Sequence, residues 1–139
     1  MIICGFPGTG KTTMAKLSRW VDLESTPFKK TWMLYAEVAK HMSDSGYTVM
    51  VSTHSELLDA LEQIEARYTV VIPPITDKDL YVRRYELRGN TLEFIEMLNT
   101  HWDKWINEIL RKPTVNKTLV VLPRDGCIKA WADEYKERE

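Results

Sequence analysis

The chain has 139 residues, of which 44% are apolar and 28% are charged. This composition is ordinary for a globular domain and excludes a disordered or fibrous chain, and the length suits one folding unit rather than two. With 19 basic and 20 acidic residues the net charge is −1, which argues against binding of duplex DNA through bulk positive charge but leaves a local basic patch open. We expect a single domain over residues 1–139.

The two cysteines give no sign of a disulfide framework. Cys4 lies in an apolar run and is expected to be a small buried residue, whereas Cys127 lies in a polar loop far along the chain. The first residues carry no targeting pattern. No apolar run approaches the roughly 18 to 20 residues that span a bilayer. We therefore expect a cytoplasmic protein (in the host cytoplasm if phage-encoded) without a membrane partner.

Short apolar runs alternate with helical patterns along the chain, which is typical of an α/β domain with a parallel sheet. The apolar runs predict strands over residues 2–4, 20–23, 48–51, 68–72 and 118–122. Apolar residues at helical spacing predict helices over residues 11–19, 29–45, 57–64, 76–88 and 91–112, and the charged last dozen residues are expected to form a short helix. Gly46 and Gly89 are expected to end two of these helices, and Pro113 a third.

Two helices carry more detailed expectations. Thr76 and Asp79 have the spacing of a capping box, with Asp in place of the usual Glu or Gln. The helix that begins near Thr91 has an apolar face made of Leu92, Ile95, Leu98, Trp102, Trp105 and Ile109. On this face we expect the two tryptophans to be core residues rather than a platform for stacking bases.

The segment Gly5-Phe6-Pro7-Gly8-Thr9-Gly10-Lys11-Thr12 matches the phosphate-binding loop G-x-x-x-x-G-K-[ST], which we call the P-loop. Its glycines allow a tight turn that points N–H groups at a phosphate, its lysine reaches the β- and γ-phosphates, and its threonine hydroxyl can ligate Mg²⁺. An apolar strand precedes the motif and a helical pattern follows it, so that an accidental glycine-rich turn is a poor alternative. The expected ATP contacts are Pro7, Gly8, Thr9, Gly10, Lys11, Thr12 and Thr13.

Acidic residues follow the second predicted strand, where ligands of open α/β sheets bind. Asp22 can hold Mg²⁺ together with Thr12, or accept a proton from a substrate hydroxyl, and Glu24 and Ser25 are candidate substrate contacts. Many P-loop enzymes carry an aspartate after a later strand, but the segment after the third strand, residues 52–55, has none. His54 in that segment either contacts the substrate or simply belongs to the turn before the next helix.

Arg83, Arg84 and Arg88 lie in one predicted helix, and Arg84 and Arg88 share a face at i,i+4 spacing. Arginines stabilise the charge that phosphoryl transfer spreads over the migrating group. We therefore expect Arg84 and Arg88 to be catalytic and Arg83 to contact the substrate. The alternative is a solvent-facing helix in which Asp79 and Glu86 pair with the arginines.

With these motifs together, the chain resembles the nucleoside-monophosphate-kinase-like group of P-loop kinases, which includes adenylate, thymidylate and shikimate kinases. It is most similar to small phage-encoded P-loop kinases, through the P-loop, the acidic strand end Asp22–Ser25, the block of Arg84-Tyr85 with Arg88-Gly89-Asn90, and the helix that carries Trp102-Asp103-Lys104-Trp105. The likeness covers nearly the whole chain. Its P-loop is highly specific to phosphate binding, and its other motifs are moderately specific.

The resemblance implies a three-layer α/β/α P-loop fold with a five-stranded parallel sheet in the order 2-3-1-4-5. It implies that Arg84 and Arg88 flank a mobile lid, and that residues 123–127, including Arg124, hold adenine. The chain departs from the group in the lid itself, because only Arg88-Gly89-Asn90-Thr91 separates the two helices. Exclusion of water would then depend on the arginine helix or on a second subunit.

Three functions follow from these observations. The leading hypothesis is an ATP- and Mg²⁺-dependent kinase that transfers the γ-phosphate to a small (deoxy)nucleoside monophosphate, with Lys11, Asp22, Arg84 and Arg88 in catalysis. The second is a kinase acting on a hydroxyl, such as that of a 5-hydroxymethylated pyrimidine in phage DNA, with Asp22 as the base. The third is a nucleotide-binding regulatory protein without turnover. A homo-oligomer is left open.

Overall fold

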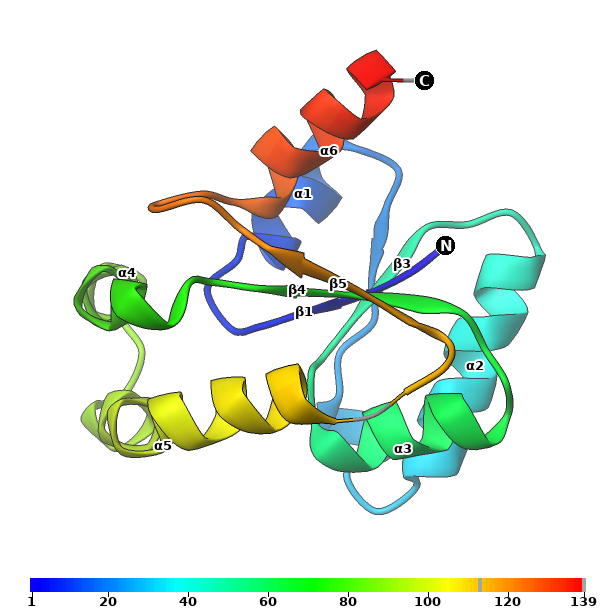
Figure 1. Cartoon of the computed structure of the whole chain (residues 1–139), viewed down its shortest axis with the longest axis horizontal. Coiled ribbons are helices and arrows are strands. Elements are labelled where there is room, and N and C mark those ends of the chain that lie inside the picture. Colours follow the sequence, from blue (N-terminus) through cyan, green and yellow to red (C-terminus); the bar gives the residue numbers. More distant parts are fainter. Residues whose placement is uncertain (113, 139) are drawn as a thin grey trace.

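The computed structural model describes residues 1–112 and 114–138, and in these residues one five-stranded sheet is built from parallel neighbours only. The strand order is β2-β3-β1-β4-β5, which confirms the predicted order. The loop that follows the central strand β1 therefore lies between the ends of β3 and β4 (Figure 1). The strands are β1 Ile2–Gly5, β2 Val21–Asp22, β3 Val49–Val51, β4 Tyr68–Ile72 and β5 Lys117–Val121.

The three central strands consist mainly of apolar residues because helices cover both of their faces. β1 and β3 are buried throughout, and Ile3 of β1 pairs with Met50 of β3 and with Thr69 of β4. β2 is shorter than expected, since only Val21 and Asp22 pair with β3. β5 lies at the edge of the sheet and is partly exposed along its whole length.

Six α-helices occur in the described part of the chain, close to the predicted positions. Their bounds are α1 Lys11–Leu17, α2 Trp32–Asp44, α3 Ser55–Gln63, α4 Lys78–Leu87, α5 Leu92–Arg111 and α6 Ile128–Arg138. Two short 3₁₀ helices, Thr26–Phe28 and Ile75–Asp77, were not predicted. None of the described helices is long and apolar enough to cross a membrane.

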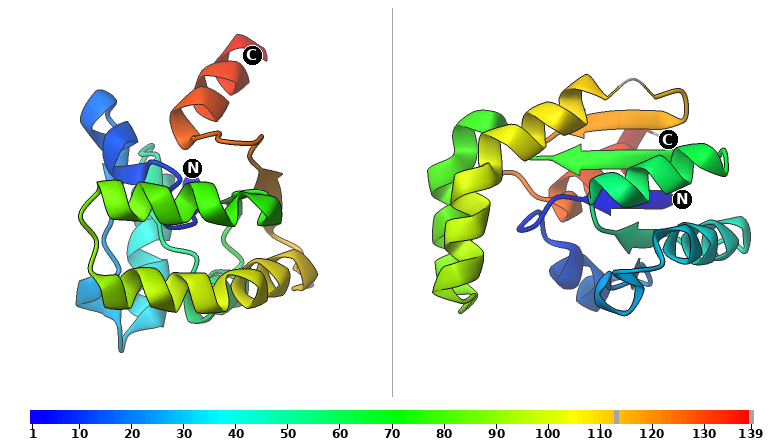
Figure 2. Two further views of the ribbon diagram at one scale, coloured as in Figure 1. Left: turned by 90° about the vertical axis from the view of Figure 1, so that its left-hand side faces the viewer. Right: turned by 90° about the horizontal axis from the view of Figure 1, so that it is seen from below.

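The helices α1 and α6 cover one face of the sheet and α2, α3 and α5 the other, which gives the predicted three-layer arrangement, and α4 lies beyond the end of β4 (Figures 1 and 2). The helices α2 to α5 contribute to the larger hydrophobic cluster, and α1 and α6 cover the other face with a smaller one. Trp102 of α5 is completely buried in the larger cluster, where its ring lies 5.3 Å from Phe6 and 5.4 Å from Tyr81, measured between ring centroids. Phe6 belongs to the P-loop and Tyr81 to α4, so the core supports both elements directly.

The predicted capping box at the start of α4 is wrong. Asp77 is the N-cap residue and makes no side-chain cap hydrogen bond, so Thr76 and Asp79 do not form the reciprocal pair. Asp77 is buried instead, and its carboxylate accepts a hydrogen bond of 2.8 Å from the backbone N–H of Asp125. A contact with a residue 48 positions away thus replaces the local cap.

The long helix α5 begins as expected, since the Thr91 side chain accepts a hydrogen bond of 3.2 Å from the Phe94 N–H. Leu92 is 72% exposed and does not belong to the buried face, because it lies in the first turn at the end of the helix. The helix ends at Arg111, and the expected role of Pro113 lies outside the described residues. The buried face consists of Ile95, Leu98, Trp102, Ile106 and Ile109.

The link between α4 and α5 is as short as the sequence indicates. α4 ends at Leu87 and α5 begins at Leu92. Gly89 has φ +76°, a value that suits glycine, and its N–H donates to the Glu86 carbonyl at 3.0 Å. The four residues between the helices form a turn rather than a flap.

Candidate functional site

The P-loop forms a compact turn between β1 and α1, at the carboxyl edge of the sheet (Figure 1). Gly8 and Gly10 have φ +88° and +100°, which other residues adopt only with strain. The hydroxyl and the N–H of Thr9 both donate to the Phe6 carbonyl, at 2.6 and 3.1 Å, and close the turn. Gly8 and Gly10 are therefore required by the backbone path.

Lys11 is folded against the loop that precedes it, with Nζ donating to the Gly5 carbonyl at 2.6 Å. Burial lowers the pKa of this ammonium, and the carboxylates of Asp22 and Glu24 oppose the shift, while the Arg88 guanidinium adds to it. Two acids from the end of β2 and one arginine from the end of α4 thus lie within electrostatic reach of Lys11. An ammonium has three donors, so Lys11 can bind a further oxygen besides Gly5.

Thr12 and Asp22 form the pair that the sequence predicts for Mg²⁺. The Thr12 hydroxyl donates to Asp22 Oδ2 at 3.3 Å, and both side chains are at least partly accessible. Mg²⁺ is commonly held by one or two protein oxygens together with phosphates and water. The donor set at this end of the P-loop therefore fits the metal, provided that a nucleotide completes the coordination.

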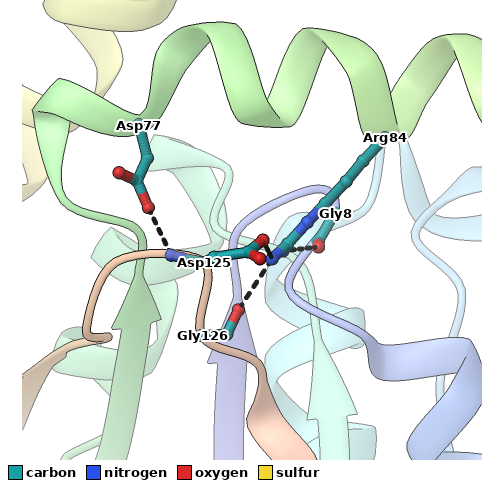
Figure 3. A network of polar contacts seen from close by, with 5 residues as sticks. All are labelled: Gly8, Asp77, Arg84, Asp125 and Gly126. Carbon is teal, nitrogen blue, oxygen red and sulfur yellow. Dashed lines mark hydrogen bonds and ion pairs between the residues drawn. The ribbon is translucent and has the colours of Figure 1, made fainter.

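Arg84 lies at the P-loop, and protein groups accept hydrogen bonds from both of its terminal nitrogens (Figure 3). Its Nη1 donates to the Gly8 carbonyl at 3.0 Å, and its Nη2 donates to Asp125 Oδ1 at 2.7 Å and to the Gly126 carbonyl at 3.2 Å. The guanidinium also lies over the Tyr81 ring, 4.4 Å from its centroid. Arg84 thus joins the P-loop to Asp125 and Gly126. Because its terminal nitrogens already donate to protein groups, these contacts do not support the predicted catalytic role of Arg84.

The other two arginines of α4 differ from Arg84. Arg88 is exposed beyond the end of the helix, with its guanidinium 5.8 Å from the centroid of the Tyr85 ring, and it is close enough to Lys11 to lower the pKa of that residue. Arg83 is exposed on the helix. Of the predicted pair, Arg88 is the arginine left available to a ligand near Lys11.

A pocket of about 370 Å³ adjoins the P-loop on the side of α3 and α5. Phe6 and Pro7 form its wall at the P-loop, and Trp105, partly buried, contributes from α5. The His101 ring stacks on Trp105 with 5.1 Å between centroids. The other lining residues come from the end of β3 and from α3 and α5: Ser52, Thr53, His54, Ser55, Glu56, Leu58, Met97, Glu108, Ile109 and Lys112.

His54 lies in the turn before α3, as one of the two alternatives expected, and its contact with a substrate stays a prediction. It is the N-cap residue of α3, where its carbonyl accepts the N–H of Leu57, and it also lines the pocket. Its Nδ1 lies 2.7 Å from Ser52 Oγ, and its ring is 4.8 Å from the Trp32 ring between centroids. Burial lowers the pKa of His54, so a neutral imidazole is favoured at the mouth of the pocket.

Four predicted contacts remain, namely Thr13, Glu24, Ser25 and Arg124. Thr13 is exposed in the first turn of α1, and Arg124 is exposed in the loop after β5. Ser25 precedes the 3₁₀ helix Thr26–Phe28, and its carbonyl accepts the Phe28 N–H. Of this group, Glu24 acts electrostatically on Lys11.

Two features of the site were not identified from the sequence. Tyr85 donates its hydroxyl to the Pro7 carbonyl at 2.7 Å, and Tyr81 lies beside it against Gly8. The repeated Tyr-x-x-Arg spacing of residues 81–84 and 85–88 is the signal that points to them. Trp105, expected only as a core residue, also lines the pocket, and no local pattern distinguishes it from Trp102.

No family model matches the chain, and no curated protein matches it in sequence. Among solved structures, the chain is similar to an uncharacterized protein from Eubacterium ventriosum, with 10% sequence identity. That similarity covers 99% of this chain and 96% of the other, with a TM-score of 0.48. The functional conclusion therefore depends on the site itself.

Proposed function

We propose that this chain is an ATP-dependent phosphotransferase. The supporting observation is the common location of Lys11, Thr12 and Asp22 at one end of the P-loop, where Thr12 bonds Asp22 at 3.3 Å and Asp22 acts on the pKa of Lys11. A basic group for phosphate oxygens and oxygen ligands for Mg²⁺ are recurring parts of enzymes that transfer phosphoryl groups.

Catalysis would consist of positioning and charge stabilisation. The Lys11 ammonium binds the terminal phosphates, and the Thr12 hydroxyl and Asp22 carboxylate hold Mg²⁺, which supplies charge neutralisation when bound. Arg88 is the proposed donor to the migrating phosphoryl group, because it is the accessible arginine near Lys11.

The pocket beside Pro7 is the proposed acceptor site, and its charge bears on the choice of acceptor. Glu56 and Glu108 line it, its basic residue Lys112 is ion-paired with Asp59, and no arginine occurs among the described lining residues. A phosphate monoester carries up to about two negative charges at neutral pH. This lining therefore favours an uncharged group bearing a hydroxyl, with Trp105 available to stack on a ring.

A nucleoside monophosphate, the leading acceptor in the sequence analysis, becomes the second candidate. Its phosphate would have to be bound outside the pocket lining, by Arg88 or Arg83, both of which are exposed on the neighbouring helix or its end. For a phosphate acceptor no general base is needed, whereas a hydroxyl must lose its proton.

Asp22→Asn distinguishes the two chemical roles of Asp22. If the carboxylate mainly holds Mg²⁺, raising the Mg²⁺ concentration should restore most of the lost rate. If it takes the proton of a hydroxyl acceptor, we expect a loss on the order of 100-fold or more that Mg²⁺ does not restore. Steady-state rates over a series of Mg²⁺ concentrations measure the difference.

The overall proposal is tested by ADP release from ATP and Mg²⁺ in the presence of single acceptors. The panel consists of the common nucleoside monophosphates, free nucleosides, and DNA with and without 5-hydroxymethylated pyrimidines. We expect acceptor-dependent release with a hydroxyl-bearing acceptor and none with the Lys11→Ala variant. If the wild-type protein binds ATP but never exceeds the Lys11→Ala background, the chain is not a kinase and the regulatory reading replaces this one.

A further inference from the structure

Three consecutive carbonyl oxygens of the P-loop accept hydrogen bonds from outside the loop. The Pro7 oxygen accepts the Tyr85 hydroxyl at 2.7 Å, and the Gly8 oxygen accepts Arg84 Nη1 at 3.0 Å. The Thr9 oxygen accepts the N–H of Ile128, the first residue of α6, at 2.9 Å. The loop is therefore held in place by α4 and by the start of α6, and we call the side that faces these two helices its rear.

These bonds also fix the directions of the N–H groups. In a planar trans peptide the C=O and the following N–H point in opposite directions, and no described peptide is cis. Bonds to the Pro7 and Thr9 carbonyls thus turn the N–H groups of Gly8 and Gly10 away from α4 and α6. The peptide between Gly8 and Thr9 is held by two hydrogen bonds, because its carbonyl accepts Arg84 Nη1 and its N–H donates to the Phe6 carbonyl.

The rings of α4 support the same arrangement by contact. A Cβ on Gly8 would lie 2.9 Å from Cε1 of Tyr85 and 3.0 Å from Cδ2 of Tyr81, so the loop backbone lies directly against both rings. Both tyrosines are fully buried. The helix therefore forms a rigid wall behind the loop, with the Tyr85 hydroxyl at one carbonyl and the Arg84 guanidinium at the next.

Arg84 extends this support to the loop of residues 123–127 (Figure 3). Its Nη2 bonds Asp125 and Gly126, and Asp125 in turn donates its N–H to the buried carboxylate of Asp77 at 2.8 Å. Asp125 has φ +58°, an unusual value that these contacts stabilise. A cation held between a carboxylate and two carbonyls is well suited to positioning backbone.

We propose that Tyr85 and Arg84 are positioning residues, which preset the N–H groups of the P-loop for a polyphosphate. The inference rests on the proposed function, because it takes the polyphosphate to be that of a nucleotide. It assigns Arg84 to the rear of the loop and leaves Arg88 as the arginine that faces the reacting phosphate. The shared helix face predicted one catalytic role for both arginines, whereas the hydrogen bonds of Arg84 distinguish it from Arg88.

The direct test is Tyr85→Phe, which keeps the ring against Gly8 and removes only the hydroxyl. Loss of one such hydrogen bond should raise the Kd for a fluorescent ATP analogue about threefold to tenfold, and leave the Kd for adenosine unchanged. Tyr68→Phe is the matched control, because Tyr68 is a buried tyrosine at the opposite end of its strand from the P-loop. Nucleotide affinity equal to the wild type in Tyr85→Phe would overturn the inference.

Arg84→Lys separates positioning from catalysis. A lysine keeps the charge but cannot bridge Gly8, Asp125 and Gly126 with one planar fork. We expect the KM for ATP to rise about tenfold while kcat changes much less. A fall in kcat with an unchanged KM for ATP would place Arg84 at the transition state and contradict the assignment.

A measurement without nucleotide keeps this inference independent of the proposed function. Amide hydrogen exchange in the peptide that contains Gly8 and Gly10 should be faster in Tyr85→Phe than in the wild type or Tyr68→Phe, because the freed carbonyl lets the loop open. Unchanged exchange would refute the positioning role. If the wild type and Lys11→Ala instead bind ATP equally poorly, the proposed function fails, and the exchange result still decides the role of Tyr85.

Discussion

The two sides of the P-loop are built in different ways. On the side of α4 and residues 123–128, carbonyls of the loop are bonded by Tyr85, Arg84 and Ile128. On the side of α3 and α5, Phe6 and Pro7 border a pocket of about 370 Å³ lined by apolar and polar side chains in similar numbers. A phosphate always presents the same oxygens, so a rigid, hydrogen-bonded loop suits it. An acceptor molecule can instead be selected by the shape of the pocket.

The largest expected effect comes from Trp102→Ala, because Trp102 supports both sides. Its ring contacts Phe6 and Tyr81, and its Nε1 donates to the Ile75 carbonyl at 2.8 Å. Truncation of a fully buried tryptophan should lower the free energy of unfolding by about 3 to 5 kcal/mol. Urea denaturation measures this loss, and a decrease below about 1 kcal/mol would mean that the two sides do not share one core.

Lys11→Ala should impair phosphoryl transfer from the nucleotide without affecting the acceptor pocket. We expect the rate of phosphoryl transfer to fall roughly 100- to 1000-fold, as for removal of a principal donor to transition-state charge. The acceptor pocket does not include Lys11, so binding of an acceptor should change little. Coupled ADP release gives the first quantity and acceptor titration the second, and an equal loss in both would show that the sides are not separable.

Trp105→Ala should weaken binding of the acceptor without affecting binding of ATP. Loss of the ring from the pocket wall should raise the KM for the acceptor about tenfold and leave the KM for ATP within about twofold. Trp20→Ala is a matched control, since Trp20 is also half-buried but packs against the smaller cluster and precedes β2 at the amino edge of the sheet. A raised KM for ATP in Trp105→Ala would assign the pocket to the nucleotide.

The smallest effect concerns pH and His54. Burial lowers the pKa of His54 below its usual value of about 6.5; Glu56 opposes this shift, and Lys11 and Lys29 add to it. The folded state therefore binds fewer protons than the unfolded state, and stability should fall as pH drops below about 6.5 and level off below the folded pKa.

Unfolding midpoints at pH 7.5 and 5.5 test this assignment. The acid-induced loss should be smaller in His54→Gln than in the wild type, while His41→Gln, on the exposed side of α2, should behave like the wild type. An identical loss in His54→Gln would exclude His54 as its source.

The order of the elements was readable from the sequence, for physical reasons that are local. The apolar run of residues 68–72 ends at two prolines, and β4 Tyr68–Ile72 has those bounds. Gly89 marks the end of a helix because only glycine adopts φ +76° without strain. The tight turn of the P-loop was predictable because motif and backbone conformation are encoded in the same eight residues.

The features that could not be predicted from the sequence depend on partners far away along the chain. Asp77 was overlooked because its partner, the N–H of Asp125, lies 48 residues away, whereas a capping box can be read within four residues. The contacts of Arg84 with Asp125 and Gly126 span 41 and 42 residues, so spacing alone could not separate Arg84 from Arg88. For the same reason nothing in the helical pattern showed that Trp105 borders a pocket.

The position of Cys127 has a practical consequence for observing nucleotide binding. A Cβ on Gly10 would lie 3.8 Å from the Cβ of Cys127, so this thiol adjoins the P-loop. Cys4 is buried, whereas Cys127 is partly accessible. The sequence therefore offers one partly accessible thiol next to the loop, and thiol alkylation should label that position, more slowly when ATP covers the loop.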